Sequence, residues 1–175
     1  MARPPGGVAG WGGVGSERDG SRNTGRPRGG RRAASPGRAM TAPPAFTETT
    51  RDVRVTVRAL FLADQSEPGR GRYAWAYQVT IANEGRQTVQ LLQRTWCITD
   101  AQGRTQHVHG EGVVGERPVL DPGESFEYTS STPLSTPSGF MRGAYHMVAA
   151  ATGEAFDVAI PGFSLDSPHH LGRVH

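Results

Sequence analysis

The sequence predicts an all-β protein, an antiparallel β-sandwich of seven or eight strands. Three observations carry this prediction. Apolar and polar residues alternate over short segments, which is typical of strands with one buried and one wet face. Turn-forming residues separate these segments at regular intervals, and no segment has a useful helical period. Short strands without intervening helices favour an antiparallel sandwich over a parallel sheet.

The first half of the predicted domain contains four strands. Residues 53–61 alternate valines with arginine and threonine, and residues 73–82 show the cleanest alternation in the chain. A third strand is expected over residues 89–99. The Asp-Ala-Gln-Gly sequence that follows predicts a hairpin loop, which leads into a short strand at residues 105–109.

The second half of the domain continues the pattern. Short strands are expected at residues 118–120 and 125–131, joined by Asp-Pro-Gly-Glu, in which the proline and glycine suit a type II turn. Two further strands are expected at residues 140–148 and 155–160. The expected core consists of the apolar residues that share one face of each strand: Val55, Val57, Trp75, Tyr77, Val79, Ile81, Leu92, Trp96, Ile98, Phe126, Tyr128, Tyr145, Met147, Phe156, Val158 and Ile160.

Charge divides the chain of 175 residues, whose formal net charge is +3, into two regions. Residues 1–39 carry eight arginines against two acidic residues, whereas residues 40–175 are net negative. The first region is rich in glycine and arginine and poor in large apolar residues, so we expect it to be disordered. It is interpreted as an Arg/Gly arm for nucleic acid, as an organelle transit peptide, or as an untranslated stretch upstream of a start at Met40.

The predicted domain, residues 50–175, is thus an acidic body and not a basic nucleic-acid-binding domain. No run of about 18 apolar residues is present, so we expect no membrane-spanning helix. The single cysteine, Cys97, excludes an intrachain disulfide and is expected to be a small buried hydrophobe. A cytoplasmic location follows as the default expectation.

One motif resembles a nucleotide-binding signature. Gly110, Gly112 and Gly115 match G-x-G-x-x-G, but that pattern binds dinucleotides only where it opens a helix after a strand. Pro118 and the turn residues beyond it leave no room for such a helix. Two interpretations remain: the glycines shape a bend between sheets, or their amides bind an anion with Arg94 and Arg117 nearby.

Few residues suggest catalysis or metal binding. His107, His109 and Glu111 follow one another at every second position, so a continuous strand would place them on one face, as a divalent-metal site requires. The competing interpretation is a wet strand face. No nucleophile with a base, no paired carboxylates and no G-x-S-x-G sequence are recognisable. We therefore expect neither enzyme activity nor a resident cofactor.

Three segments together resemble the ApaG family. They are RYAWAYQVTIANEGRQTVQLLQRTWCITDAQG at residues 72–103, GEGVVGERPVLDPGESFEYTS at residues 110–130 and TPSGFMRGAYHMV at residues 136–148. The similarity extends over about residues 53–175, and the N-terminal 39 residues have no counterpart. The resemblance implies an immunoglobulin-like or fibronectin-III-like sandwich and carries over the glycine motif. It also carries over an aromatic and basic wall: Tyr73, Trp75, Arg94, Trp96 and Tyr128. It does not carry over the histidines at 107 and 109.

The family resemblance also implies a function. ApaG domains occur in eukaryotic F-box proteins and in a DNA-polymerase-delta-interacting protein, where they resemble interaction modules, and the bacterial proteins are linked to cobalt and magnesium resistance. We therefore expect a non-catalytic module that binds a protein partner through a sheet edge or through residues 110–117. The alternative is a binder of a phosphate-bearing ligand or a divalent metal complex at the same loop.

Overall fold

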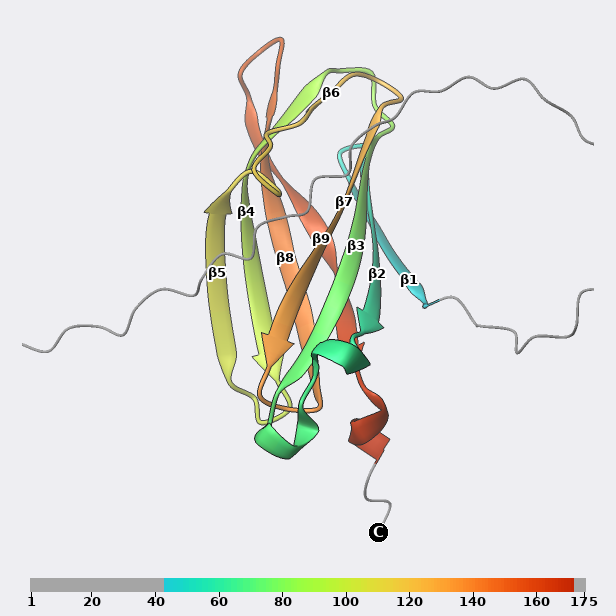
Figure 1. Ribbon diagram of the computed structural model, residues 1–175. Helices are drawn as coiled ribbons and strands as arrows, with labels where there is room; N and C mark the ends of the chain where they lie inside the picture. Colours follow the sequence, from blue (N-terminus) through green and yellow to red (C-terminus); the bar gives the residue numbers. More distant parts are fainter. Residues whose placement is uncertain (1–42, 172–175) are drawn as a thin grey trace, which may run out of the picture. The chain divides into compact units, whose positions relative to one another are not determined.

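A computed structural model describes residues 43–171 and confirms the antiparallel β-sandwich (Figure 1). The segment predicted to be disordered, residues 1–39, lies outside the described residues. Within them, the secondary structure consists of nine strands and three short 3-10 turns. None of these turns is long and apolar enough to span a membrane.

The strands follow the chain in the predicted order, with one addition before the first. They are β1 Ala45–Thr50, β2 Val53–Phe61, β3 Tyr73–Asn83, β4 Val89–Asp100, β5 Thr105–Glu111, β6 Val119–Leu120, β7 Ser125–Leu134, β8 Ser138–Ala149 and β9 Ala155–Asp166. The 3-10 turns are η1 Ala63–Gln65, η2 Pro68–Arg70 and η3 Pro168–Leu171.

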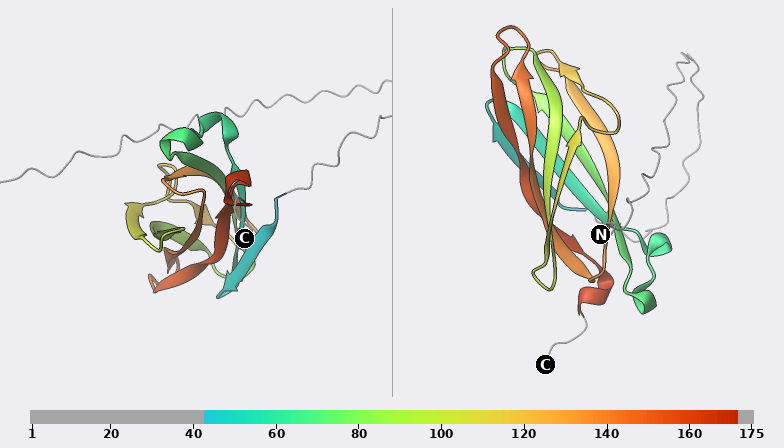
Figure 2. Two further views of the ribbon diagram at one scale, coloured as in Figure 1. Left: turned by 90° about the horizontal axis from the view of Figure 1, so that it is seen from below. Right: turned by 90° about the vertical axis from the view of Figure 1, so that its left-hand side faces the viewer.

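The strands form two antiparallel sheets that face one another (Figure 2). The first sheet has the order β1-β2-β3-β7, and the second has the order β5-β4-β8-β9, with β6 paired to β4. The chain crosses between sheets after β3, after β6 and again after β7. Every strand pair is antiparallel, as the short, regularly spaced turns predict.

The largest differences from the prediction are the additional strand β1 and the end of β9; β5, β7 and β8 extend one to three residues beyond their predicted ranges. Strand β1 was not predicted, because only Phe46 among its central residues is packed against the core and its remaining surface is largely exposed. Strand β9 continues past residue 160 to Asp166, and Phe163 and Leu165 are fully buried. The sequence Pro161-Gly162 resembles a break, but it coincides with a register shift in the pairing of β8 with β9, where a strand tolerates proline.

Most of the predicted core is buried between the sheets, and one residue was assigned wrongly. Leu92 is only half-buried, whereas Leu91 is fully buried, because a β-bulge between Leu91 and Gln93 changes the phase of β4. Phe126 and Phe156 are partly buried against the core. Cys97 is buried, as predicted.

Three tyrosines lie at the centre of the sandwich. The hydroxyl groups of Tyr128 on β7 and Tyr145 on β8 are 2.5 Å apart, so this hydrogen bond joins the two sheets directly. Tyr77 on β3 is also buried. Burial raises the pKa of all three phenols, because the charged phenolate loses its hydration.

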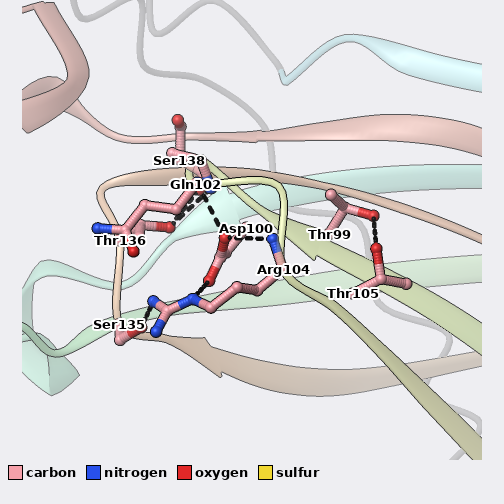
Figure 3. A network of polar contacts seen from close by, with 9 residues as sticks. Thr99, Asp100, Gln102, Arg104, Thr105, Ser135, Thr136 and Ser138 are labelled. Atoms are coloured by element: carbon pink, nitrogen blue, oxygen red, sulfur yellow. Dashed lines mark hydrogen bonds and ion pairs between the residues drawn. The ribbon is translucent and has the colours of Figure 1, made fainter.

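One end of the sandwich is held by the β4–β5 hairpin (Figure 3). The Asp100 carboxylate accepts hydrogen bonds from the backbone of Gln102 at 2.9 Å and of Arg104 at 3.0 Å, and from the Arg104 guanidinium at 2.7 Å. Against the opposing effect of desolvation, these bonds lower the pKa of Asp100. Arg104 also donates to Ser135, and the Ala101 amide donates to Thr136, so the hairpin is tied to the turn between β7 and β8.

The tyrosine pair predicts a loss of stability in alkali. The pKa of Tyr128 and of Tyr145 lies above the ordinary value of 10.0 in the folded protein. Above pH 10 the unfolded chain therefore releases phenolic protons that the folded chain keeps. The free energy of unfolding should fall by up to about 1.4 kcal/mol per pH unit for each phenol.

Urea denaturation between pH 9 and 11.5 measures this slope. The double variant Tyr128→Phe/Tyr145→Phe should show a shallower fall than the parent protein, because it has lost two of the linked protons. Equal slopes for the two proteins would contradict a buried, protonated pair.

Candidate functional site

The predicted glycine motif forms a tight hairpin at the end of β5. The Val113 amide donates to the carbonyl of Glu116 at 2.8 Å, and the Glu116 amide donates to the carbonyl of Val113 at 2.9 Å. The two residues between them, Val114 and Gly115, have φ angles of 44° and 79°, as a type I′ turn requires. Gly112 has a φ of 56°, and a Cβ there would overlap the Glu116 carbonyl. Between Gly115 and β7 the chain forms no helix and continues to β6.

The tip of this hairpin presents an unusual side chain. Val114 is a β-branched residue with a positive φ, a conformation that such residues rarely adopt. Its side chain is exposed, while the neighbouring Val113 is fully buried and anchors the turn. Backbone strain of this kind persists only where the surrounding structure imposes it, and it is found often at functional sites.

Arg94 on β4 stabilises the base of the hairpin through hydrogen bonds. Its guanidinium lies against Gly110, where a Cβ would come within 2.9 Å of the guanidinium atoms. From that position Nη1 donates to the carbonyl of Glu111 at 3.0 Å and to the carbonyl of Gly112 at 2.6 Å. A second arginine, Arg117, forms an ion pair with the Glu111 carboxylate. A glycine is therefore required at position 110, because a larger residue would clash with the Arg94 guanidinium.

The structure thus brings together four of the five residues predicted to bind a ligand, namely Gly110, Gly112, Arg94 and Arg117, whereas Gly115 lies at the tip of the hairpin with open space around it. Their principal donors are directed at the protein itself. The Gly112 amide donates to the carbonyl of Leu92 at 2.8 Å, Arg94 donates to two loop carbonyls, and Arg117 is paired with Glu111. This arrangement explains the shape of the loop without a bound anion.

The three residues of the predicted metal site share a strand face but do not converge. Val108 packs against the core, so its neighbours His107 and His109 lie on the outer face of β5 with Glu111. Glu111 contacts Gln93 at 3.0 Å in addition to Arg117. In residues 43–171 no three or more His, Cys, Asp or Glu side chains are grouped to hold a metal ion. The site at His107, His109 and Glu111 stays a prediction.

His109 instead belongs to a row of polar side chains that crosses all four long strands of the second sheet. His109 on β5 is the cross-strand partner of Thr95 on β4, and His146 on β8 is the partner of Asp157 on β9. Thr95 and His146 are diagonal neighbours, because the partner of His146 on β4 is Gln93. Thr95 Oγ1 lies 3.1 Å from His109 Nδ1 and 2.7 Å from His146 Nε2. His146 Nδ1 lies 2.7 Å from Asp157 Oδ1.

Sequence reasoning missed this row except for His109. Its members are distant in the chain, and no spacing rule connects them. Only the register of β4, β5, β8 and β9 places them side by side, and a single sequence does not specify that register. The imidazole and carboxylate groups form an ordered chain of hydrogen bonds on the outer surface of the sheet.

The backbone offers a second feature, the free edge of β5. Strands β1 and β9 lie against each other at one side of the sandwich, where the Ala159 amide donates to Thr50 Oγ1 at 3.2 Å. The edge strand β7 carries Pro133, which has no amide proton to donate. Strand β5 is the outermost strand at the other end of the second sheet (Figure 1).

The register of β5 determines which of its groups are free. The bonds from Asp100 to Arg104 and from Gly112 to Leu92 set the phase of its pairing with β4. Because antiparallel pairs alternate, the backbone amides and carbonyls of Thr105, His107 and His109 point away from β4. Within residues 43–171 no strand pairs with these groups, and the edge that they form ends at the Val113–Glu116 hairpin.

The sequence of this domain is similar to that of one known protein family. Residues 63–149 match the model of the ApaG domain. The chain is 64% identical over 128 residues to Protein ApaG of Rhodospirillum centenum, covering 73% of this chain and 98% of that protein. It is 58% identical to Protein ApaG of Paramagnetospirillum magneticum, covering 74% and 99%.

A solved structure gives the same result. The crystal structure of the ApaA protein from Bordetella pertussis superposes with a TM-score of 0.65 at 44% sequence identity, covering 73% of this chain and 98% of that one. Fold and sequence agree over the same part of the chain, and the relatives are covered almost completely. The chain belongs to the ApaG family.

Proposed function

We propose that the domain is a non-catalytic binding module that docks a protein partner along the edge of β5. The observation that carries this proposal is the unpaired backbone of Thr105, His107 and His109. An extended segment of a partner adds to such an edge through main-chain hydrogen bonds. The other edges are less suitable, because β1 and β9 lie against each other and β7 contains a proline.

The hairpin beside this edge supports the proposal. Arg94 fixes the loop carbonyls, and Val114 presents an exposed apolar side chain where β5 ends. A rigid apolar contact at one end of an edge strand would select among partners, since backbone pairing alone carries little sequence preference. Preorganisation also reduces the entropy that is lost when a partner binds.

The family link to cobalt and magnesium resistance enters the proposal through the partner. A domain that binds another protein would influence metal tolerance by changing the activity of that protein.

The alternative, a phosphate-bearing ligand at residues 110–117, is favoured by one observation: four of the five predicted residues lie together at the base of one hairpin. Their donors are engaged, so a ligand would have to displace the bonds of Arg117 and Arg94. Calorimetric titration with pyrophosphate tests this alternative. Heat at millimolar ligand that Arg117→Gln abolishes would favour the ligand binder over the docking module, and we expect no such heat.

The edge proposal is tested by one proline substitution. His107→Pro removes an outward-facing amide proton while leaving the hydrogen bonds to β4 intact, since proline is tolerated at such a position on an edge strand. In affinity purification from native cells, a partner that the parent protein recovers should be lost with this variant. His107→Thr keeps the amide and should recover the same partner.

Thermal unfolding shows whether the proline variant is folded. If it is not, Thr105→Pro, at the first residue of β5, replaces it. A folded proline variant that recovers the same partner as the parent protein would exclude the β5 edge as the docking site.

The shaping role of the glycines is tested separately. Gly112→Ala places a Cβ against the Glu116 carbonyl at a positive φ, so we expect the free energy of unfolding to fall by roughly 1–3 kcal/mol. Gly115 also has a positive φ but has open space around it, and asparagine tolerates that conformation. Gly115→Asn should therefore change stability much less. Equal effects, measured by urea denaturation, would disprove the steric role of Gly112.

A further inference from the structure

We propose that His109 and His146 form a binding site for a first-row transition-metal dication, such as Zn²⁺ or Ni²⁺, on the outer face of the second sheet. The proposal rests on the side-chain row and not on the free edge of β5. It uses His109 but neither His107 nor Glu111, so it differs from the metal site that the sequence suggests.

Two ring nitrogens are aimed at one point. His109 Nδ1 approaches Thr95 Oγ1 from β5 at 3.1 Å, and His146 Nε2 approaches the same oxygen from β8 at 2.7 Å. The ring centroids are 5.9 Å apart. A hydroxyl has a single proton, so it donates to only one of the two rings at a time. Neutral imidazole nitrogens are preferred ligands of zinc, nickel and copper, and here two of them converge across one intervening strand.

The contact between His146 and Asp157 is of a kind that is common in metal centres. Asp157 Oδ1 lies 2.7 Å from His146 Nδ1. When Nδ1 carries the proton, Nε2 keeps its lone pair and faces Thr95. Histidine ligands of metal ions nearly always donate their other ring proton to a carboxylate or carbonyl, which fixes the tautomer and the ring orientation. Asp157 thus acts as the positioning residue of the proposed site.

The neighbouring residues explain why the site contains two imidazoles and no more. Glu111 is paired with Arg117 and Gln93, and His107 lies one cross-strand row away, opposite Cys97. Among the described residues no third His, Cys, Asp or Glu completes the set. The remaining coordination positions would be filled by water or by the Thr95 hydroxyl. The site is partly open, because the His146 side chain is 33% exposed.

The test is a zinc titration of the full-length, untagged chain by calorimetry. Three histidines near the C-terminus, at positions 169, 170 and 175, are replaced by glutamine in every sample, because a histidine-rich end binds such metals loosely. This background chain should bind one equivalent of Zn²⁺. His109→Gln and His146→Gln should each weaken binding at least tenfold. Asp157→Asn should weaken it by about 10-fold, the lower end of the effect of such carboxylates.

His107→Gln is the matched control, since His107 lies on the same strand and the same face as His109. Its affinity should stay within about twofold of the background chain. Circular dichroism of each variant confirms that it is folded. Equal weakening by His107→Gln and His109→Gln, full affinity in His146→Gln, or no binding by the background chain would each overturn the proposal.

Discussion

The contact between the inner faces of the two sheets is the constraint on which the rest of the molecule depends. Trp75, Tyr145 and Phe163 are among the largest side chains that are fully buried there, and the Tyr128–Tyr145 hydrogen bond crosses the interface. A strand that slipped by one residue would turn its whole apolar set outward. The core therefore fixes the register of the strands that have a buried face, the hairpin bonds fix that of β5, and the register determines which side chains meet on the outer face. The histidine row is a consequence of that register.

Arg94 shows how the core extends into the candidate site. It has the same orientation on β4 as Trp96 and Ile98, so the base of its side chain points toward the inside of the sandwich. There its positive charge opposes the rise that burial causes in the pKa of the three phenols. The guanidinium reaches the loop carbonyls beneath Gly110. The same glycine spacing that admits a pyrophosphate at the start of a helix here admits an arginine at the end of a strand. The sequence motif alone does not distinguish the two, whereas the prolines that follow it do.

Alternation along the chain predicted the strands and most of the core, because each strand has one buried face. It failed where that rule fails: at Leu92, beside a bulge, and in β1, where only one side chain is packed against the core. The positive φ angles of the glycine loop were expected from local residues, but the predicted bend between sheets was wrong: the loop joins β5 to β6, which both pair with β4 in the second sheet. The row of His109, Thr95, His146 and Asp157 did not, because it depends on the order of four strands. Sheet order arises from long-range packing, and no local pattern records it.

His109 belongs to both surface features, which links the two proposals physically. Its backbone is part of the free edge of β5, while its ring contacts Thr95 in the row. An ion held by His109 and His146 would cross-link β5 to β8 over β4 and would restrain the edge strand from the side. A partner paired along β5 would restrain the same residue from the other side. Because both ligands would contact His109, any effect of one on the affinity of the other must be equal in both directions.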